Sequence, residues 1–183
     1  IGRGIHYNGY RFIVTGQGSV SIAYSEDGFT WTGATNSTNI FSTTGWNGGM
    51  SNQYGCVSMI NPVVAVGEAG NNNSINYSPD GIYWHEGGEW MFNQNGWNVG
   101  YNGILWVAVG EGNNHHFGYS FDGMNWVGLG KTFFTTRGLA VGWNGSYWLV
   151  GGRGGTSLLI ISYDGINWTE VTQSVFTTQV RAL

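Results

Sequence analysis

The sequence predicts an all-β protein in which one structural unit is repeated four times. The pattern Ser-x-Asp-Gly-x-x-Trp occurs with its aspartate at Asp27, Asp80, Asp122 and Asp164. These aspartates are 53, 42 and 42 residues apart, and the tryptophan always follows four positions later. No window combines a helical apolar period with helix caps. Tandem units of about 40 to 50 residues with a tryptophan and a turn in fixed register are typical of β-propeller blades. We therefore predict a β-propeller with four blades of four antiparallel strands each.

A second repeated feature lies upstream of each motif and predicts the second strand of each unit. Apolar runs that end in glycine occupy residues 12–16, 63–67, 106–110 and 148–152. Their β-branched and aromatic residues predict buried strands. In the third unit we expect strands ending at Tyr101, over about 104–109, over about 116–119, and from Trp126 to about Phe134. The single domain 1–183 then divides into blades at about 1–41, 55–94, 95–136 and 137–178, followed by residues 179–183.

An aromatic-Asn-Gly tripeptide precedes three of the four apolar runs. The three tripeptides are Tyr7-Asn8-Gly9, Tyr101-Asn102-Gly103 and Trp143-Asn144-Gly145. Asn-Gly tolerates positive φ at both central positions of a type I′ turn, so we predict hairpins of that type. The second unit has Asn61-Pro62 instead, and its turn is expected to differ.

Two irregularities interrupt the repeat. The longer first interval predicts an insertion at residues 43–54, a flexible loop ahead of a second-blade inner strand near Cys56. At the other end, residues 176–183 match residues 134–141, so the tail begins a fifth inner strand. Three arrangements are open: a compact four-bladed ring, four units of a larger ring, or half of a dimeric ring. The chain begins without an initiator Met or a signal-peptide profile, which favours a processed product or an excerpt.

The composition indicates a folded chain and argues against nucleic-acid binding. Only 9% of the residues are charged, whereas the chain has 10 Trp, 10 Tyr and 9 Phe. Disordered chains lack such apolar side chains. The formal net charge is −4 and there is no basic run to neutralise phosphates. No apolar stretch is long enough for membrane insertion, and the single cysteine excludes an internal disulfide.

The repeated motif resembles the Asp-box of sialidase-like (BNR) and kelch-like propellers. It is one residue shorter than the Asp-box pattern Ser-x-Asp-x-Gly-x-x-Trp, and similar tandem units occur in bacterial surface proteins, large viruses and phages. The resemblance covers essentially the whole chain. It implies that the motif is a folding element at the turn between third and fourth strands, away from the ligand face. It also implies an extracellular, cell-surface or virion-associated protein.

The chemistry of the motif agrees with a structural role. The aspartate can accept backbone N–H bonds, the glycine supplies positive φ, and the tryptophan packs between blades. The residues assigned to this structural role are Ser25, Asp27, Gly28, Trp31, Ser78, Asp80, Gly81, Trp84, Ser120, Asp122, Gly123, Trp126, Ser162, Asp164, Gly165 and Trp168.

Binding residues are expected at the opposite end of the blades, where the loops between second and third strands are the least uniform segments. Aligned residues Gln17, Glu68, Glu111 and Arg153 are predicted to face one centre, although solvated loops with an internal Glu–Arg pair would have the same sequence. The aromatic residues are candidates for stacking on sugar rings, with inter-blade packing as the alternative. The candidate ligand-binding residues are Trp46, Asn47, Gln53, Tyr54, Glu68, Asn71, Asn72, Trp97, Glu111, Asn113, His115 and Arg153.

These observations favour a non-catalytic module that binds a glycan or a protein. The arginines do not match a sialidase triad, and only Glu68 and Glu111 are placed to act as paired carboxylates. We expect no metal and no cofactor, because His115 and His116 would point to opposite faces of a strand. A fragment of a sialidase-like enzyme and a purely structural, self-assembling virion or surface protein are the alternatives.

Overall fold

The computed structural model describes residues 2–35, 41–49, 62–70, 73–88, 90–155, 157–172 and 176–183. Every regular element within these residues is a β-strand, and none is a helix. The prediction of an all-β protein is confirmed.

The strands form four antiparallel meanders, which we call units 1 to 4. Unit 1 contains β1 (Gly2–Tyr7), β2 (Phe12–Gly16), β3 (Ile22–Ser25) and β4 (Thr32–Gly33). Unit 2 contains β5 (Phe41–Gly49), β6 (Val63–Gly70), β7 (Asn73–Ser78) and β8 (His85–Gly87). Unit 3 contains β9 (Asn95–Tyr101), β10 (Trp106–Glu111), β11 (Phe117–Ser120) and β12 (Val127–Gly128). Unit 4 contains β13 (Arg137–Trp143), β14 (Trp148–Arg153), β15 (Leu159–Ser162) and β16 (Thr169–Glu170).

The four units share one strand register. In every unit the serine of the repeated motif ends the third strand and pairs with the first residue of the second strand. These pairs are Phe12 with Ser25, Val63 with Ser78, Trp106 with Ser120, and Trp148 with Ser162. Equivalent positions in the four units can therefore be compared residue by residue.

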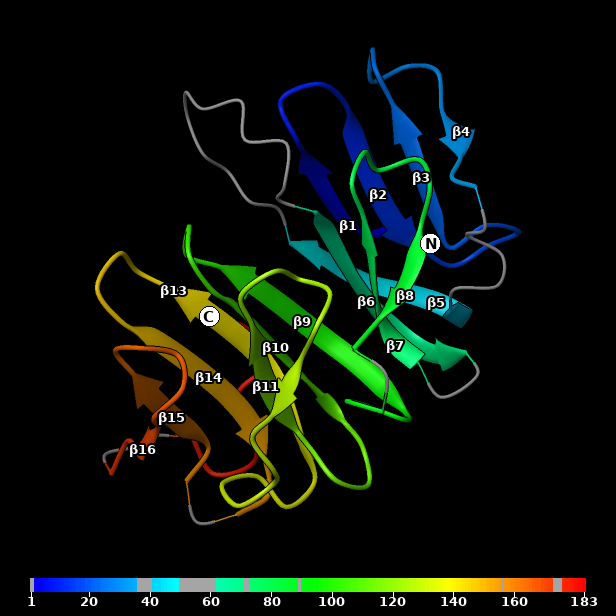
Figure 1. Ribbon diagram of the computed structural model, residues 1–183. Helices are drawn as coiled ribbons and strands as arrows, with labels where there is room; N and C mark the ends of the chain where they lie inside the picture. The colour runs from blue at the N-terminus through cyan, green and yellow to red at the C-terminus, as the bar shows by residue number, and fades with distance from the viewer. Residues whose placement is uncertain are drawn as a thin grey trace.

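The units follow one another as an open arc (Figure 1). Unit 1 packs on unit 2 through β1, β2 and β5, unit 2 on unit 3 through β5, β6 and β9, and unit 3 on unit 4 through β9, β10 and β13. A ladder pair between Glu68 and Asn95 joins units 2 and 3 into one eight-stranded sheet. In Figure 1 the blue strands of unit 1 and the yellow to orange strands of unit 4 lie at opposite ends of the arc.

Three apolar clusters fill the three interfaces between consecutive units. Strand periodicity explains them, since alternate residues of each second strand point to opposite neighbours. The contributing second-strand residues are Ile13 with Val63 and Ala65, then Val64 and Val66 with Trp106 and Ala108, then Val107 and Val109 with Trp148 and Val150. The motif tryptophans Trp84, Trp126 and Trp168 join the same three clusters. Burial of this apolar surface, at roughly 25 cal/mol per Å², is what holds one unit on the next.

The fourth strands are shorter than predicted. In unit 3 the strand that was expected to reach Phe134 covers only Val127–Gly128. Gly130 adopts a φ of 78°, in the left-handed region, so the chain turns away soon after β12. Phe134 is completely buried, but it serves the next unit by packing against Gly152.

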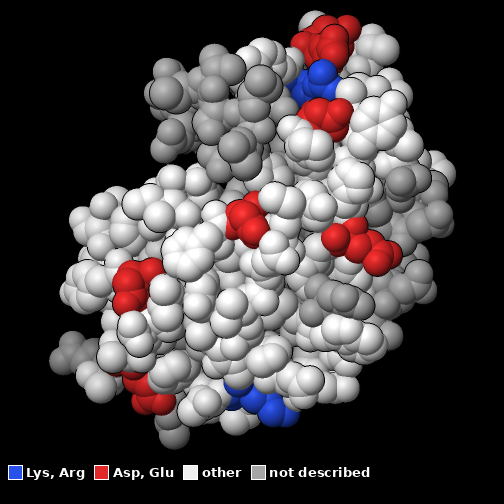
Figure 2. Space-filling model, in the orientation of Figure 1, with Lys and Arg blue, Asp and Glu red and all other residues white. Residues whose placement is uncertain are grey.

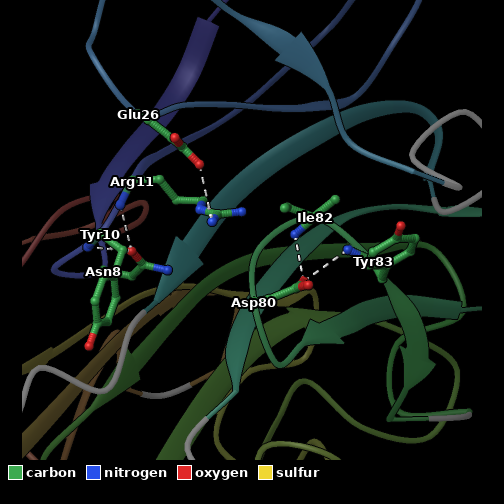
Figure 3. A network of polar contacts seen from close by, with 7 residues as sticks. All are labelled: Asn8, Tyr10, Arg11, Glu26, Asp80, Ile82 and Tyr83. Carbon is green, nitrogen blue, oxygen red and sulfur yellow. Dashed lines mark hydrogen bonds and ion pairs between the residues drawn. The ribbon is translucent and has the colours of Figure 1, made fainter. Parts of the chain in front are cut away.

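The prediction of type I′ hairpins is wrong. Positive φ falls on Gly9, Gly103 and Gly145, whereas none of the preceding asparagines has it. The Asn8 backbone N–H donates to Arg11 O at 3.1 Å, so Gly9 is the first of the two residues between them and is the one with positive φ. Asn8 precedes the two central residues of the turn, and its side-chain Oδ1 accepts the N–H groups of Tyr10 and Arg11 (Figure 3).

The insertion was also misplaced. Residues 43–49 are not a loop, because they belong to β5, the inner strand of unit 2. Phe41 and Gly45 correspond in register to Phe92 and Gly96, which moves the extra residues to the connection between β5 and β6. That connection leaves Gly49 and enters Val63 at the end of the units that carries the Asp-Gly turns. Residues 50–61 themselves lie outside the described residues.

Candidate functional site

The four copies of the repeated motif form the same hydrogen-bonded turn. In unit 3 the Ser120 hydroxyl donates to Asp122 Oδ1 at 2.9 Å and accepts the Gly123 N–H at 2.8 Å. Asp122 Oδ1 also accepts the N–H groups of Met124 and Asn125 at 2.8 and 2.7 Å. Trp126 Nε1 donates to Gly123 O, and the glycine has a φ of 73°. The serine hydroxyl, the aspartate Oδ1 and the tryptophan Nε1 of the motif thus serve the turn, as the sequence predicted.

These hydrogen bonds hold the aspartates in the charged form. The N–H groups of Thr30 and Phe29 lower the pKa of Asp27 from 3.8 to about 2. The side-chain amide and the N–H of Asn167 hold the pKa of Asp164 well below its usual value. Burial is the largest influence on Asp80 and would raise its pKa, but hydrogen bonds from Tyr83 and Ile82 outweigh it and the pKa is lowered.

The turn of unit 2 also ties units 1 and 2 together. Figure 3 shows Arg11 of unit 1 reaching towards this turn, while Ile82 and Tyr83 direct their N–H groups at Asp80. Arg11 forms an ion pair with Glu26 at 3.3 Å, and its charge helps to lower the pKa of Asp80. The Asp-Gly turns are therefore structural contacts within and between units.

The opposite end of the units carries a compact polar and aromatic cluster, which we call the Arg137 cluster. Arg137 begins β13 and donates from NH1 to Glu111 Oε2 at 3.0 Å. Its Cζ lies 5.5 Å from the centre of the Trp97 ring, within range of a cation–π contact. The side chains of Arg137 and Glu111 are 24% and 21% exposed, so solvent or a ligand reaches both. Trp97, Glu111 and Arg137 form the Arg137 cluster.

The sequence identified two members of this cluster and missed the third. Glu111 and Trp97 were predicted as binding residues, whereas Arg137 was not. Arg153, the expected partner for a glutamate, is exposed, and its strand partners are Arg137 and Gln179. The missed signal was register: the first residue of an inner strand lies beside the residue that follows the apolar run of the preceding second strand, as Asn95 of β9 lies beside Glu68 of β6.

The remaining predicted residues are distributed differently. Asn113 is exposed, and its N–H donates to Asn93 Oδ1 at 2.9 Å. The His115 Nδ1 accepts the Gly130 N–H at 3.0 Å, and its ring packs on Gly128. Glu68 is partly buried in β6. For Trp46 and Asn47 only the backbone of β5 is described, while Gln53, Tyr54, Asn71 and Asn72 lie outside the described residues.

His115 and His116 serve different structural contacts. The His116 ring is buried with Nδ1 against Phe134 O, and burial lowers its pKa. Within the described part of the chain no three His, Cys, Asp or Glu side chains come together in a way that could hold a metal ion. The described residues likewise contain no helix of the length and apolarity needed to cross a membrane.

The face in view in Figure 2 has acidic side chains at several separate places and basic side chains at only two. This pattern follows from a chain with ten acidic and six basic residues. Basic side chains do not gather into a patch on that face, in keeping with the absence of a basic run in the sequence.

Comparison with known proteins places the fold. No family model matches the chain, and no curated protein matches it. The structure of YCF48 from Cyanidioschyzon merolae matches with a TM-score of 0.58 at 13% identity, over 100% of this chain and 59% of that chain. A structure described as YCF48 bound to D1 peptide matches with a TM-score of 0.46 at 10% identity, over 92% of this chain and 66% of that chain. This chain therefore spans less than two thirds of each. The likeness to YCF48, a β-propeller, shows that the fold of this chain is propeller-like.

Proposed function

We propose that the four units are propeller blades and that the chain is a non-catalytic recognition module for a protein partner. Its binding surface is the Arg137 cluster together with the surrounding ends of β6, β10 and β14. The observation that carries this proposal is the cation–π contact of Arg137 with Trp97 while Arg137 pairs with Glu111. These three side chains offer a donor fork, a carboxylate acceptor and an aromatic surface side by side.

This combination suits an extended peptide segment of a protein. Arginine and tryptophan are enriched where protein interfaces concentrate their binding energy. The Glu111 carboxylate can accept a backbone N–H from the segment, and the guanidinium can donate to its carbonyl groups. Because Trp97 holds the guanidinium in place, little side-chain entropy is lost on binding. The Asp-Gly turns at the opposite end of the units also support the proposal, since their carboxylates already accept hydrogen bonds within the turns.

A selection from a random peptide phage library tests the proposal. Peptides selected on the wild-type chain are expected to bind about tenfold or more weakly to the Arg137→Ala and Trp97→Ala variants, as for loss of an interface anchor. The exposed Lys131 provides a matched control, and Lys131→Ala is expected to bind like the wild type. Circular dichroism of each variant separates lost binding from lost fold.

Selected peptides that bind all variants equally would contradict the proposed surface. A glycan array tests the glycan alternative, and sugar binding that is lost in Glu111→Ala would replace the protein partner by a carbohydrate. Turnover of a fluorogenic sialoside would overturn the non-catalytic assignment.

A further inference from the structure

The end of the units that carries the Asp-Gly turns exposes several large apolar side chains. In each unit the turn between the first and second strands lies beside the Asp-Gly turn, because both follow the same row of paired residues. In unit 3 that row is Tyr101, Trp106 and Ser120. On these turns five large apolar side chains are 56% to 75% exposed, and we call them the turn surface. They are Tyr10, Tyr83, Ile104, Phe121 and Tyr163.

This exposure does not arise from an end of the arc. Units 2 and 3 each pack on a neighbouring unit at both sides, and Tyr83, Ile104 and Phe121 belong to them. Tyr10 holds the position of Ile104 in its own turn, and Tyr163 holds the position of Phe121. The repeat therefore presents these positions to solvent even where a unit has both neighbours.

The fold does not require apolar side chains at these positions. The hydrogen bonds of the third Asp-Gly turn come from Ser120, Asp122 and backbone N–H groups, and none involves the Phe121 side chain. The same position holds Glu26 in unit 1 and Pro79 in unit 2. An apolar ring that stays in water adds no burial energy to the fold. Exposed apolar surface of this kind is typical of an interaction site.

Two of the rings are held in fixed orientations. The Phe121 ring lies 5.7 Å from the Tyr119 ring at an interplanar angle of 82°, and the Tyr163 ring lies 6.1 Å from the Tyr147 ring at 70°. These edge-to-face contacts restrict the rings and still leave most of their surface exposed. A ring that is already oriented loses little side-chain entropy when a ligand packs on it.

The same end of the units is acidic. The four motif aspartates and Glu26 lie in the sequence of these turns, whereas Arg11 is the only lysine or arginine there. Arg11 forms an ion pair with Glu26, which balances one charge of each sign. The pKa values of the four aspartates are lowered, so these carboxylates are charged at neutral pH. Their hydrogen bonds within the turns do not remove that negative charge.

The turns of consecutive units adjoin one another, which joins the rings and carboxylates into one surface. The contacts across the three interfaces are Gly81 with Arg11, Gly123 with Val64, and Gly165 with Leu105. Figure 3 shows the junction of units 1 and 2, with Tyr10, Asp80 and Tyr83 in one view. An extended segment that follows the turns would therefore meet rings and carboxylates of more than one unit.

We propose that the turn surface is a second binding site, which takes a basic, arginine- or lysine-containing segment of a protein partner. Charge complementarity selects this occupant, because a cation is attracted both by the face of a tyrosine or phenylalanine ring and by a neighbouring carboxylate. An anionic lipid surface would be repelled by the same carboxylates. The turn surface lies at the opposite end of the units from the Arg137 cluster, so the two sites bind independently.

A labelled peptide in which arginine alternates with glycine tests the site by fluorescence anisotropy. The wild-type chain is expected to bind this peptide and not a matched peptide in which glutamate replaces arginine. The affinity should fall when the salt concentration is raised from about 0.1 to about 1 M, since the Debye length shortens from about 10 to about 3 Å.

Variants of the rings locate the binding. Phe121→Ala and Tyr163→Ala are each expected to weaken binding of the arginine peptide about two- to fivefold, as for loss of an exposed cation–π contact. Phe121→Lys should weaken it further, because it also adds a like charge. Trp90 is 61% exposed in the connection between β8 and β9, at the opposite end, and Trp90→Ala is the matched control that should bind like the wild type. Circular dichroism checks that each variant is folded.

The outcomes separate this site from the Arg137 cluster. Arg137→Ala is expected to bind the arginine peptide like the wild type, so failure of one site does not imply failure of the other. The proposal is rejected if the Phe121→Ala, Tyr163→Ala double variant binds the peptide as tightly as the wild type, or if the wild type does not bind at concentrations up to about 1 mM. Binding of a neutral glycan or of phosphatidylserine vesicles that this double variant loses, without binding of the arginine peptide, would also reject a basic protein segment as the occupant.

Discussion

Gly151 in β14 lies directly against Val180 of the C-terminal segment, which comprises residues 176–183. A Cβ built on Gly151 would be 2.6 Å from Val180 Cγ1 and 2.8 Å from Val180 Cβ. At the equivalent place between units 3 and 4 the small and large residues are exchanged, with Val109 on the second strand and Gly138 on the inner strand. In both places a glycine on one strand faces a valine on the other. The glycine lies on the second strand in one case and on the following segment in the other.

This pairing predicts a steric rescue. Gly151→Val should overlap with Val180 and release the C-terminal segment, since overpacking typically costs about 1–3 kcal/mol. Adding Val180→Gly should restore docking by recreating the arrangement of the other interfaces. Hydrogen exchange of the residue-180 amide, which donates to Gly152 O, measures the effect.

The control for this rescue is Gly2→Val, because nothing lies within 4 Å of a Cβ at Gly2. The account of this interface would be wrong if Gly151→Val left the residue-180 amide protected, or if the double variant stayed unprotected.

The motif serine should contribute more to the stability of the fold than its small size indicates. Ser120 is 1% exposed and bonds both Asp122 and the Gly123 N–H. Ser120→Ala leaves that buried N–H without its acceptor, which should lower the free energy of unfolding by about 1–3 kcal/mol. Urea unfolding measures the loss, and Ser146→Ala at an exposed turn should change it by less than about 0.5 kcal/mol. Equal stability of the two variants would contradict the structural role of the motif.

The motif tryptophan should contribute more to stability in unit 2 than in unit 1. Trp84 is buried at the interface with unit 1, so Trp84→Ala should cost about 3–5 kcal/mol. Trp31 makes the same bond from Nε1 to a glycine carbonyl, but it is 41% exposed, so Trp31→Ala should cost clearly less. Thermal or urea unfolding of both variants provides the comparison. A larger loss for Trp31 would mean that the interface between units 1 and 2 does not depend on Trp84.

Stability should fall in acid through the motif aspartates. Their folded-state pKa values are lowered, so they bind fewer protons in the folded chain than in the unfolded chain. The stabilisation is thus complete above the unfolded pKa of about 3.9 and is lost as the pH falls from about 4 towards 2, the folded pKa of Asp27.

Unfolding free energies between pH 6 and pH 2 measure this loss. Asp27→Asn should lower stability at neutral pH and flatten its dependence on pH below 4. An unchanged slope in that variant would show that other groups cause the acid dependence.

The motif was readable from the sequence because its chemistry is local. Ser120, Asp122, Gly123 and Trp126 lie within seven consecutive residues, and each fills a hydrogen-bonding or φ requirement of one turn. The all-β class followed from the same repetition. The hairpin type was predicted wrongly because the asparagine was expected to adopt positive φ. Its side-chain oxygen instead accepts backbone N–H groups of the turn.

The sequence by itself determined the repeated unit, its strand order and the structural role of its aspartates, since these depend on contacts between residues close in the chain. Only the tertiary structure brought Arg137 to Glu111 and Trp97, because residues 26 and 40 positions apart meet through the register of strands in neighbouring units. It also moved the insertion to the connection between β5 and β6, since pairing with β6 was needed to assign residues 41–49 to a strand. The exposure of apolar side chains at the two ends of the arc is also visible only in the tertiary structure. Whether Ile5, Trp31 and Phe176 are covered depends on which unit lies beside them, and that is a property of the packed units.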